Sequence, residues 1–212
     1  MPSYSLTNEK LLQVVAQNDE IYSKRGSMIA YKGSFNFARA HLIGGSIQQA
    51  AMRAVTREGL QLMSATGSGE IYYAHLGKFI TIISLNGETM YVESDSVIAF
   101  DKRLRADTMF LGNQGIQGLI RGATAGQGLF TTTLSGRGEL AIISDGNAIA
   151  LDVTSDRTLF VDPNAYIGHK GQLTSTTVFD VSWKNLIGQG SGESFQLKFT
   201  GTGTVYIQAS ER

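Results

Sequence analysis

The stretch TGSGEIYYA at residues 66–74 returns in outline twice more along the chain. It recurs as SGRGELAII at 135–143 and as TGTGTVYIQ at 200–208, each time with two glycines one residue apart. The first glycines of the three copies are 69 and 65 residues apart, and a nearly constant period indicates an internal repeat. The six glycines to which we assign a structural role in this repeat are Gly67, Gly69, Gly136, Gly138, Gly201 and Gly203.

An apolar run interrupted by a turn-forming dipeptide precedes each glycine pair. The dipeptides are Asn18-Asp19, Asn86-Gly87 and Asp145-Gly146. Asn-Gly and Asp-Gly are strong signals for two-residue hairpin turns, because both central residues of a type I′ turn need positive φ. The sequence therefore predicts a β-hairpin at each of the three places.

A third phrase follows each predicted hairpin. The three copies are GSMIAYK at 26–32, DSVIAFD at 95–101 and DRTLFVD at 156–162. The phrases are short, rich in β-branched and aromatic residues and bounded by Gly, Asn and Asp, a composition typical of strands. With three markers in the same order, we expect one all-β domain over residues 1–212, built from three tandem β repeats at about 10–75, 76–143 and 144–209.

Alternation of residues around the glycine pairs predicts where the glycines point. Successive side chains on a strand point to opposite faces, so two glycines one residue apart share a face. That face is mainly apolar, as Ile71, Leu140 and Val205 show at the same offset from their glycine pairs. Glycine inside a strand usually marks a bend or the close approach of another backbone. We expect the three pairs to lie where the three units meet; a tight turn between two separate strands is the alternative.

One segment departs from the β pattern. Residues 44–59 read GGSIQQAAMRAVTREG, with a capping box at Ser46 and Gln49 and a C-terminal Gly59. The apolar residues make one stripe, with Arg53 and Arg57 outside it. The sequence predicts a short helix inserted in the first repeat, packed on a sheet. In the alternative interpretation it is a basic amphipathic helix whose two arginines contact a membrane or a partner.

Composition limits the classes of function. The 212 residues carry no net charge, which argues against binding polyanions through a global field. The chain has no cysteine, so thiolate chemistry and disulfides are excluded. The first 20 residues lack the apolar core of a signal peptide, and no apolar run reaches the roughly 20 residues of a spanning helix. We expect a cytoplasmic protein.

The segment GSMIAYKGSFNFARAHLIGGSIQQAAMRAVTREGLQLMSATGSGEIYYA resembles the AIM24 family (DUF124). The resemblance covers about residues 10–209 and implies a three-repeat β fold with pseudo-threefold symmetry, akin to subunits of the tryptophan RNA-binding attenuation protein and in outline β-prism-like. It also implies no established enzymatic activity, while mitochondrial members are linked to inner-membrane organisation. The residues that match the family pattern are Gly26, Met28, Gly33, Gly44, Gly45, Thr66, Gly67 and Gly69.

Signatures of an enzyme are missing from the sequence. His41, His75 and His169 do not occur in H-x-H or H-E-x-x-H, so we predict no metal site and no cofactor. The glycine-rich stretches 122–128 and 188–194 lack the Lys-Ser/Thr of a P-loop, and the chain has no G-x-S-x-G. We therefore expect a non-enzymatic scaffold that binds a protein partner and copies of itself, since exposed strand edges have to be covered.

A small-ligand or single-stranded nucleic-acid binding module is the alternative. The stretch DKRLRAD at 101–107 is locally basic, and Lys102, Arg103 and Arg105 are, with Arg53 and Arg57, the candidate partner-contact residues. A single-strand binder needs a basic groove with stacking aromatic rings. The other residues that could supply one are Tyr22, Lys24, Arg25, Tyr31, Lys32, Phe35, Phe37 and Arg39. The flanking acids and zero net charge make nucleic acid the weaker prediction.

Overall fold

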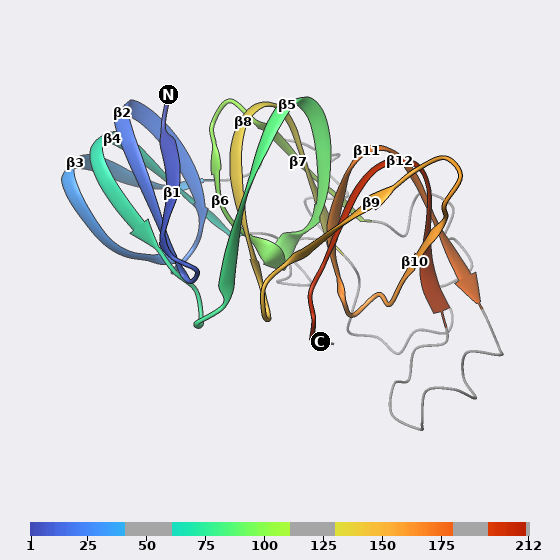
Figure 1. Cartoon of the computed structure of the whole chain (residues 1–212). Helices are drawn as coiled ribbons and strands as arrows, with labels where there is room; N and C mark the ends of the chain where they lie inside the picture. The colour runs from blue at the N-terminus through green and yellow to red at the C-terminus, as the bar shows by residue number, and fades with distance from the viewer. Residues whose placement is uncertain (41–60, 111–129, 180–194, 211–212) are drawn as a thin grey trace.

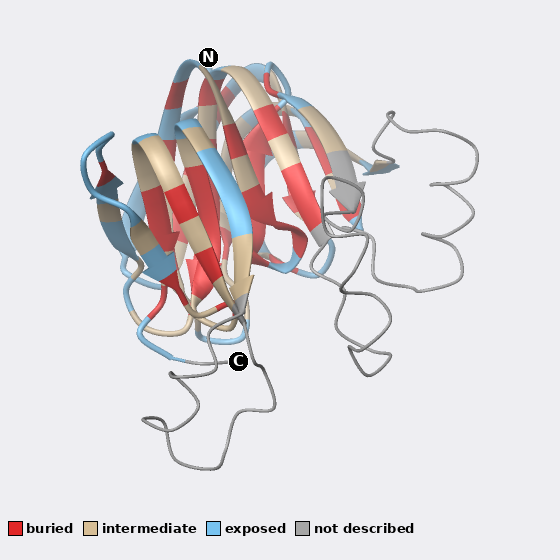
Figure 2. Ribbon diagram, turned by 90° about the vertical axis from the view of Figure 1, so that its right-hand side faces the viewer, coloured by how far each residue is buried: buried red, intermediate tan, exposed pale blue. Residues whose placement is uncertain are grey.

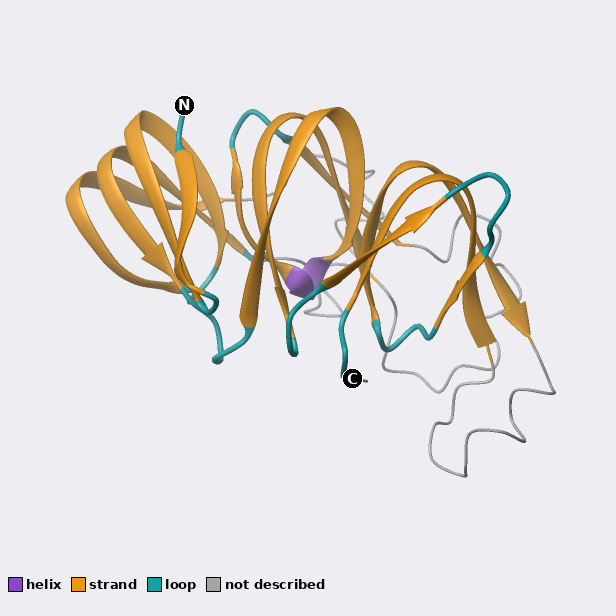
Figure 3. Ribbon diagram, in the orientation of Figure 1, coloured by secondary structure: helices purple, strands orange, loops and turns teal. Residues whose placement is uncertain are grey.

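The computed structural model describes residues 1–40, 61–110, 130–179 and 195–210 (Figure 1). The described chain is all-β, with twelve strands in one open antiparallel sheet and a single turn of 3-10 helix at Ser94–Ser96 (Figure 3). The strands are β1 (Ser3–Asn8), β2 (Leu11–Lys24), β3 (Met28–Ala40), β4 (Leu62–Tyr73), β5 (Phe79–Glu93), β6 (Val97–Asp101), β7 (Arg105–Phe110), β8 (Phe130–Ser144), β9 (Ile149–Val153), β10 (Leu159–Val161), β11 (Tyr166–Phe179) and β12 (Phe195–Ile207).

The strands form three groups that follow one another along the chain, β1–β4, β5–β8 and β9–β12 (Figure 1). In each group the strand that carries a glycine pair is flanked on both sides. β4 lies between β2 and β3. β8 has β5 on one side and β6 and β7 on the other. β12 has β11 on one side and β9 and β10 on the other. The pairs β2–β6 and β5–β11 join neighbouring groups, which makes the sheet continuous.

The three predicted hairpins are wrong. β2 runs unbroken through Asn18, and the register against β4 shifts between Gln17 and Asp19, which marks a β-bulge. Likewise β5 runs through Asn86-Gly87, with a register shift before Thr89. Asp145-Gly146 lies in a connection between β8 and β9, which pair with β5 and β12 respectively and not with each other. The same positive φ that suits a hairpin turn, 57° at Asn18, here accommodates the extra residue of a bulge.

Each bulge preserves the apolar face of its strand. In β2 the buried positions are even-numbered before the bulge, at Leu12, Val14 and Ala16, and odd-numbered after it, at Ile21 and Ser23. Side chains alternate between the two faces with period two, so in a regular strand the even-numbered and odd-numbered apolar residues would lie on opposite faces. The extra residue of the bulge brings both sets to the core face. Figure 2 shows the resulting alternation of buried and less buried residues along the strands.

The core is continuous across the groups. The hydrophobic cluster of the first group, which includes Leu12 and Ile71, also contains Ile98 and Ile143 from the second. The cluster of the second group takes in Ile167 from the third. A third cluster is built around Val161, Phe199 and Val205. The first and second groups therefore each bury apolar side chains of the group that follows them.

The predicted helix at 44–59 lies outside the described residues, and so do Arg53 and Arg57. Among the helical segments of the part that the structure describes, none is long and apolar enough to cross a membrane.

Candidate functional site: the two ends of the sheet

The junction between the first and second groups is a short antiparallel pairing of β2 with β6. Ile21, Tyr22 and Ser23 lie opposite Asp101, Phe100 and Ala99, respectively. The rings of Tyr22 and Phe100 are 5.4 Å apart between centroids, and Phe100 is fully buried. The junction therefore combines backbone pairing with one aromatic contact.

The junction between the second and third groups has the same form. Met90, Tyr91 and Val92 of β5 lie opposite Lys170, His169 and Gly168 of β11, respectively. Every residue in this junction stands 69 positions after its counterpart in the first one. The rings of Tyr91 and His169 stack with centroids 4.9 Å apart, as Tyr22 and Phe100 meet in the first junction.

His169 is buried among aromatic rings in this second junction. Its Nδ1 atom lies 2.6 Å from the hydroxyl oxygen of Tyr166, and the ring of Phe199 is 5.2 Å away between centroids. Burial lowers the pKa of His169 to about 4, because desolvation disfavours the charged imidazolium. Burial likewise raises the pKa of Tyr166, so both groups are neutral at pH 7 and act as packing groups.

The two ends of the sheet lack such a junction within the described residues. β3 pairs there only with β4, and β10 pairs only with β12. Large apolar side chains are exposed on both strands: Ile29 is 59% exposed, Tyr31 is 51% exposed and Phe160 is 49% exposed. Exposed strand edges with apolar side chains are where proteins associate. We take these two ends as the candidate interaction site.

Aromatic side chains gather on β3. The ring of Tyr31 lies 5.0 Å from that of Phe37 and 6.1 Å from that of Phe35, measured between centroids. Lys32 and Arg39 are on the same strand and are exposed. Phe35 and Phe37 pack partly against the core of the first group. The exposed apolar surface of this end therefore comes from Ile29 and Tyr31, beside the charged Lys32 and Arg39.

The glycine pairs admit neighbouring backbone within their own groups. A Cβ added to Gly69 would lie 2.0 Å from the carbonyl oxygen of Lys32, and one on Gly201 would lie 2.2 Å from that of Gln172. Crowding is milder in the second group, where a Cβ on Gly136 would be 3.1 Å from the carbonyl oxygen of Arg103. The close approach that the sequence predicts is present. Our expectation that the pairs lie where the units meet is wrong, since the nearest atoms belong to the same group each time.

The basic segment is neutralised by its own chain. Lys102 forms an ion pair with Glu20, Arg103 pairs with the buried Asp101, and the Arg105 Nε atom is 3.2 Å from Asp107. The pKa of Lys102 is raised, mainly by its hydrogen bond to Glu20. The Lys102 pair links the end of β6 to β2, the other two pairs are local, and together the three leave little net charge for a partner.

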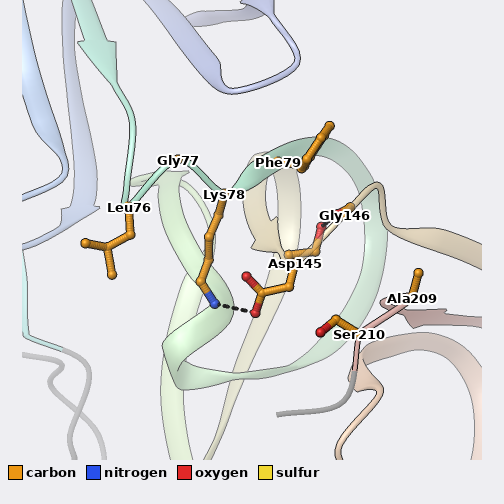
Figure 4. Close-up of a pocket in the computed structure, with 9 residues that line it drawn as sticks. Leu76, Gly77, Lys78, Phe79, Asp145, Gly146, Ala209 and Ser210 are labelled. Atoms are coloured by element: carbon orange, nitrogen blue, oxygen red, sulfur yellow. Dashed lines mark hydrogen bonds and ion pairs between the residues drawn. The ribbon is translucent and has the colours of Figure 1, made fainter.

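An open pocket of about 440 Å³ lies below the connection between β4 and β5 (Figure 4). Lys78 and Asp145 face each other in it, with the ammonium nitrogen 2.9 Å from a carboxylate oxygen. The other lining residues are Leu76, Gly77, Phe79, Ser144, Gly146, Ala209 and Ser210. Because the ammonium group of Lys78 is already paired, the lining residues that the structure describes offer no unpaired charge to orient a ligand.

Histidines and carboxylates do not form a metal site in the part of the chain that the structure describes. His169 is buried in a junction, His75 is in the β4–β5 connection, and His41 lies outside the described residues.

Sequence reasoning missed Ile29 and Phe160, and it misplaced the third marker. The sequence pattern matches 156–162 with 26–32 and 95–101, and the structure shows that this match is wrong. Leu159–Val161 pairs with β12 in the way that the end of β2 pairs with β4. The segment that joins the preceding group, as β6 does, is the start of β11. The signal was in the sequence, since IYS at 21–23, MYV at 90–92 and LFV at 159–161 are each 69 residues apart.

Comparison with known proteins agrees with this fold. An X-ray structure of a Streptococcus pyogenes protein from a structural-genomics consortium superposes with a TM-score of 0.71 at 17% identity, covering 100% of this chain and 94% of that one. A search of curated proteins found no match. The family model described as "Mitochondrial biogenesis AIM24" matches residues 4–210. The chain therefore belongs to the AIM24 family.

Proposed function

We propose that this protein is a non-enzymatic cytoplasmic scaffold that acts by protein–protein interaction and self-assembly. It is composed of three copies of one β unit, and the two end units present the edges through which it associates. The observation that carries the proposal is the exposure of Ile29, Tyr31 and Phe160 on strands with only one partner among the described residues. The family description connects relatives with mitochondrial biogenesis, and a scaffold is compatible with that role.

Light scattering coupled to size-exclusion chromatography tests self-assembly. We expect a mass above that of the 22.9 kDa chain, and we expect it to fall on dilution. A constant mass equal to one chain across a hundredfold range of concentration would contradict the self-assembly proposal. A pulldown from the native cell then identifies the protein partner.

Single-stranded nucleic acid is the second candidate, favoured by the cluster of Tyr31, Phe35 and Phe37 beside Lys32 and Arg39. Fluorescence anisotropy with a labelled single-stranded RNA tests it at several salt concentrations. Binding that weakens as salt rises, and that is lost in Arg39→Gln, would support it. Absence of binding in 50 mM salt would exclude it.

A further inference from the structure

We propose that β10 of one copy pairs antiparallel with β3 of a second copy, in the register of the two internal junctions. This inference rests on the proposed self-assembly and names its partner and its contact. The pairs across the interface are Leu159 with Lys32, Phe160 with Tyr31, and Val161 with Ala30 of the second copy.

The register follows from the internal junctions. Tyr22 lies opposite Phe100 in the first, and Tyr91 lies opposite His169 in the second. One further step of 69 residues along the chain leads from Tyr91 to Phe160, which lies on the terminal strand β10. One step backwards leads from Phe100 to Tyr31, which lies on the other terminal strand, β3. Phe160 and Tyr31 are therefore the two halves of a third junction.

Exposure of the two terminal strands supports the same pairing. Ile98 and Ile167 are fully buried at the internal junctions, while Ile29, at the corresponding position of β3, is mostly exposed. Phe100 and His169 are buried as well, whereas their counterpart Tyr31 is half exposed. The terminal strands thus carry apolar side chains that are covered wherever the junction is complete.

The hydrophobic clusters identify what would cover Ile29. Ile98 belongs to the cluster of the preceding group, and Ile167 likewise joins the cluster of the group before its own. By the same rule, Ile29 of the second copy would pack on the third cluster, which is built around Val161 and Phe199. The contact would add backbone pairing, an aromatic pair and a buried isoleucine, as each internal junction does.

The partner is a second copy, because β3 and β10 are at opposite ends of the sheet. The strand order begins with β10 and ends with β3, and Figure 1 shows the β5–β8 group between the groups that contain them. Contact between two different surfaces is heterologous, so copies join head to tail and form a ring or a filament. Pairing of β3 with β3 would instead be a two-fold contact.

Two single substitutions separate these arrangements. Tyr31→Asp blocks the β3 end and Phe160→Asp blocks the β10 end; both side chains are half exposed, so each chain is expected to fold, which circular dichroism checks. In a head-to-tail assembly each variant alone is monomeric, because every contact needs one end of each kind. An equimolar mixture forms heterodimers and stops there, since the remaining ends are blocked. Leu76→Asp, at an exposed residue away from both ends, assembles as the wild type does.

The outcomes are distinct. Monomeric wild type would refute self-assembly together with this inference, whereas a multimeric wild type whose two variants do not combine on mixing would refute this inference alone. Assembly of Phe160→Asp as in the wild type would point to a two-fold contact through β3 and overturn the head-to-tail arrangement. Binding of RNA by a monomeric wild type, with loss in Tyr31→Asp, would assign the β3 end to nucleic acid.

Cysteine cross-linking tests the register directly, because the chain has no cysteine of its own. The double variant Tyr31→Cys/Phe160→Cys should form inter-chain cross-links with a short bifunctional reagent, and mass spectrometry should recover the joined peptides. The control Arg39→Cys/Phe160→Cys places one thiol eight residues further along β3, about 26 Å away, and should not react across chains. Equal cross-linking in both variants would overturn the proposed register.

Discussion

His169 packs in the second junction as a phenylalanine packs in the first, although its side chain can take up a proton. It occupies the place in the second junction that Phe100 occupies in the first, and both rings contact a tyrosine from the neighbouring group. An imidazole packs there in its neutral form, since no carboxylate of the described residues contacts His169 and burial opposes its charge. We therefore expect the second junction to respond to acid through His169, whose counterpart in the first junction, Phe100, does not titrate.

We predict that acid destabilises the fold through His169. Above pH 6.5 neither state binds a proton at this residue, so its contribution to the free energy of unfolding is constant. Below pH 6.5 the unfolded chain binds a proton at His169, whereas the folded chain does not bind it until about pH 4. The free energy of unfolding therefore falls over that range by on the order of 3 kcal/mol. Urea unfolding between pH 8 and pH 4.5 measures the effect.

His169→Phe should remove this pH dependence while introducing the residue type found at Phe100. His75→Gln is the matched control; it should retain most of the fall, because His75 is less buried. An unchanged pH profile in His169→Phe would show that other groups cause the acid sensitivity.

Along the paired strands, the bulges lie opposite the glycine pairs. Gly67 lies opposite Asp19, beside the bulge of β2, and Gly136 lies opposite the bulge of β5. In the third group the corresponding strand is interrupted between β9 and β10, next to the part of β12 that contains Gly201. We infer that the bulge and the glycines together allow the long strands to bend at mid-length, because a bulge increases local twist and glycine lets the neighbouring backbone approach.

We predict that Gly69→Ala is much more damaging than Gly77→Ala. The new methyl group at residue 69 would meet backbone atoms of Lys32 and Gly33, which cannot move without displacing β3. We expect a loss of at least about 2 kcal/mol in the free energy of unfolding. At Gly77 no atom lies within 4 Å, so only the positive φ of 67° is penalised, at about 1 kcal/mol. Chemical denaturation of both variants measures the difference, and equal losses would contradict it.

The sequence predicts the class of fold and the crowded glycines, but it does not distinguish a bulge from a hairpin. A residue that accepts positive φ, such as Asn18 or Gly87, suits a bulge as well as a hairpin turn, and the continuation of pairing beyond it separates the two. The partner of Lys102 could not be predicted for a different reason. Glu20 is 82 residues from Lys102 in the chain and comes beside it only through the β2–β6 pairing.

Coupling between groups is the property that belongs to the whole molecule. Each internal junction inserts apolar side chains of one group into the core of the preceding one, as Ile98 and Ile167 do. A group separated from its neighbour would expose these side chains, so we expect the described sheet to unfold in one cooperative transition rather than group by group.

Ile98→Ala and Ile29→Ala test this coupling with the same side chain at a closed junction and at an open end. At Ile98, fully buried, the substitution should lower the free energy of unfolding by about 2–5 kcal/mol in a single transition. At Ile29 the loss should be below about 0.5 kcal/mol in dilute protein, where the end is uncovered. Raising the concentration should increase the penalty at Ile29 and leave that at Ile98 unchanged, because assembly adds stability only through the ends. Thermal unfolding at several concentrations checks both, and a penalty at Ile29 that is large in dilute protein would mean that β3 is already covered within one chain.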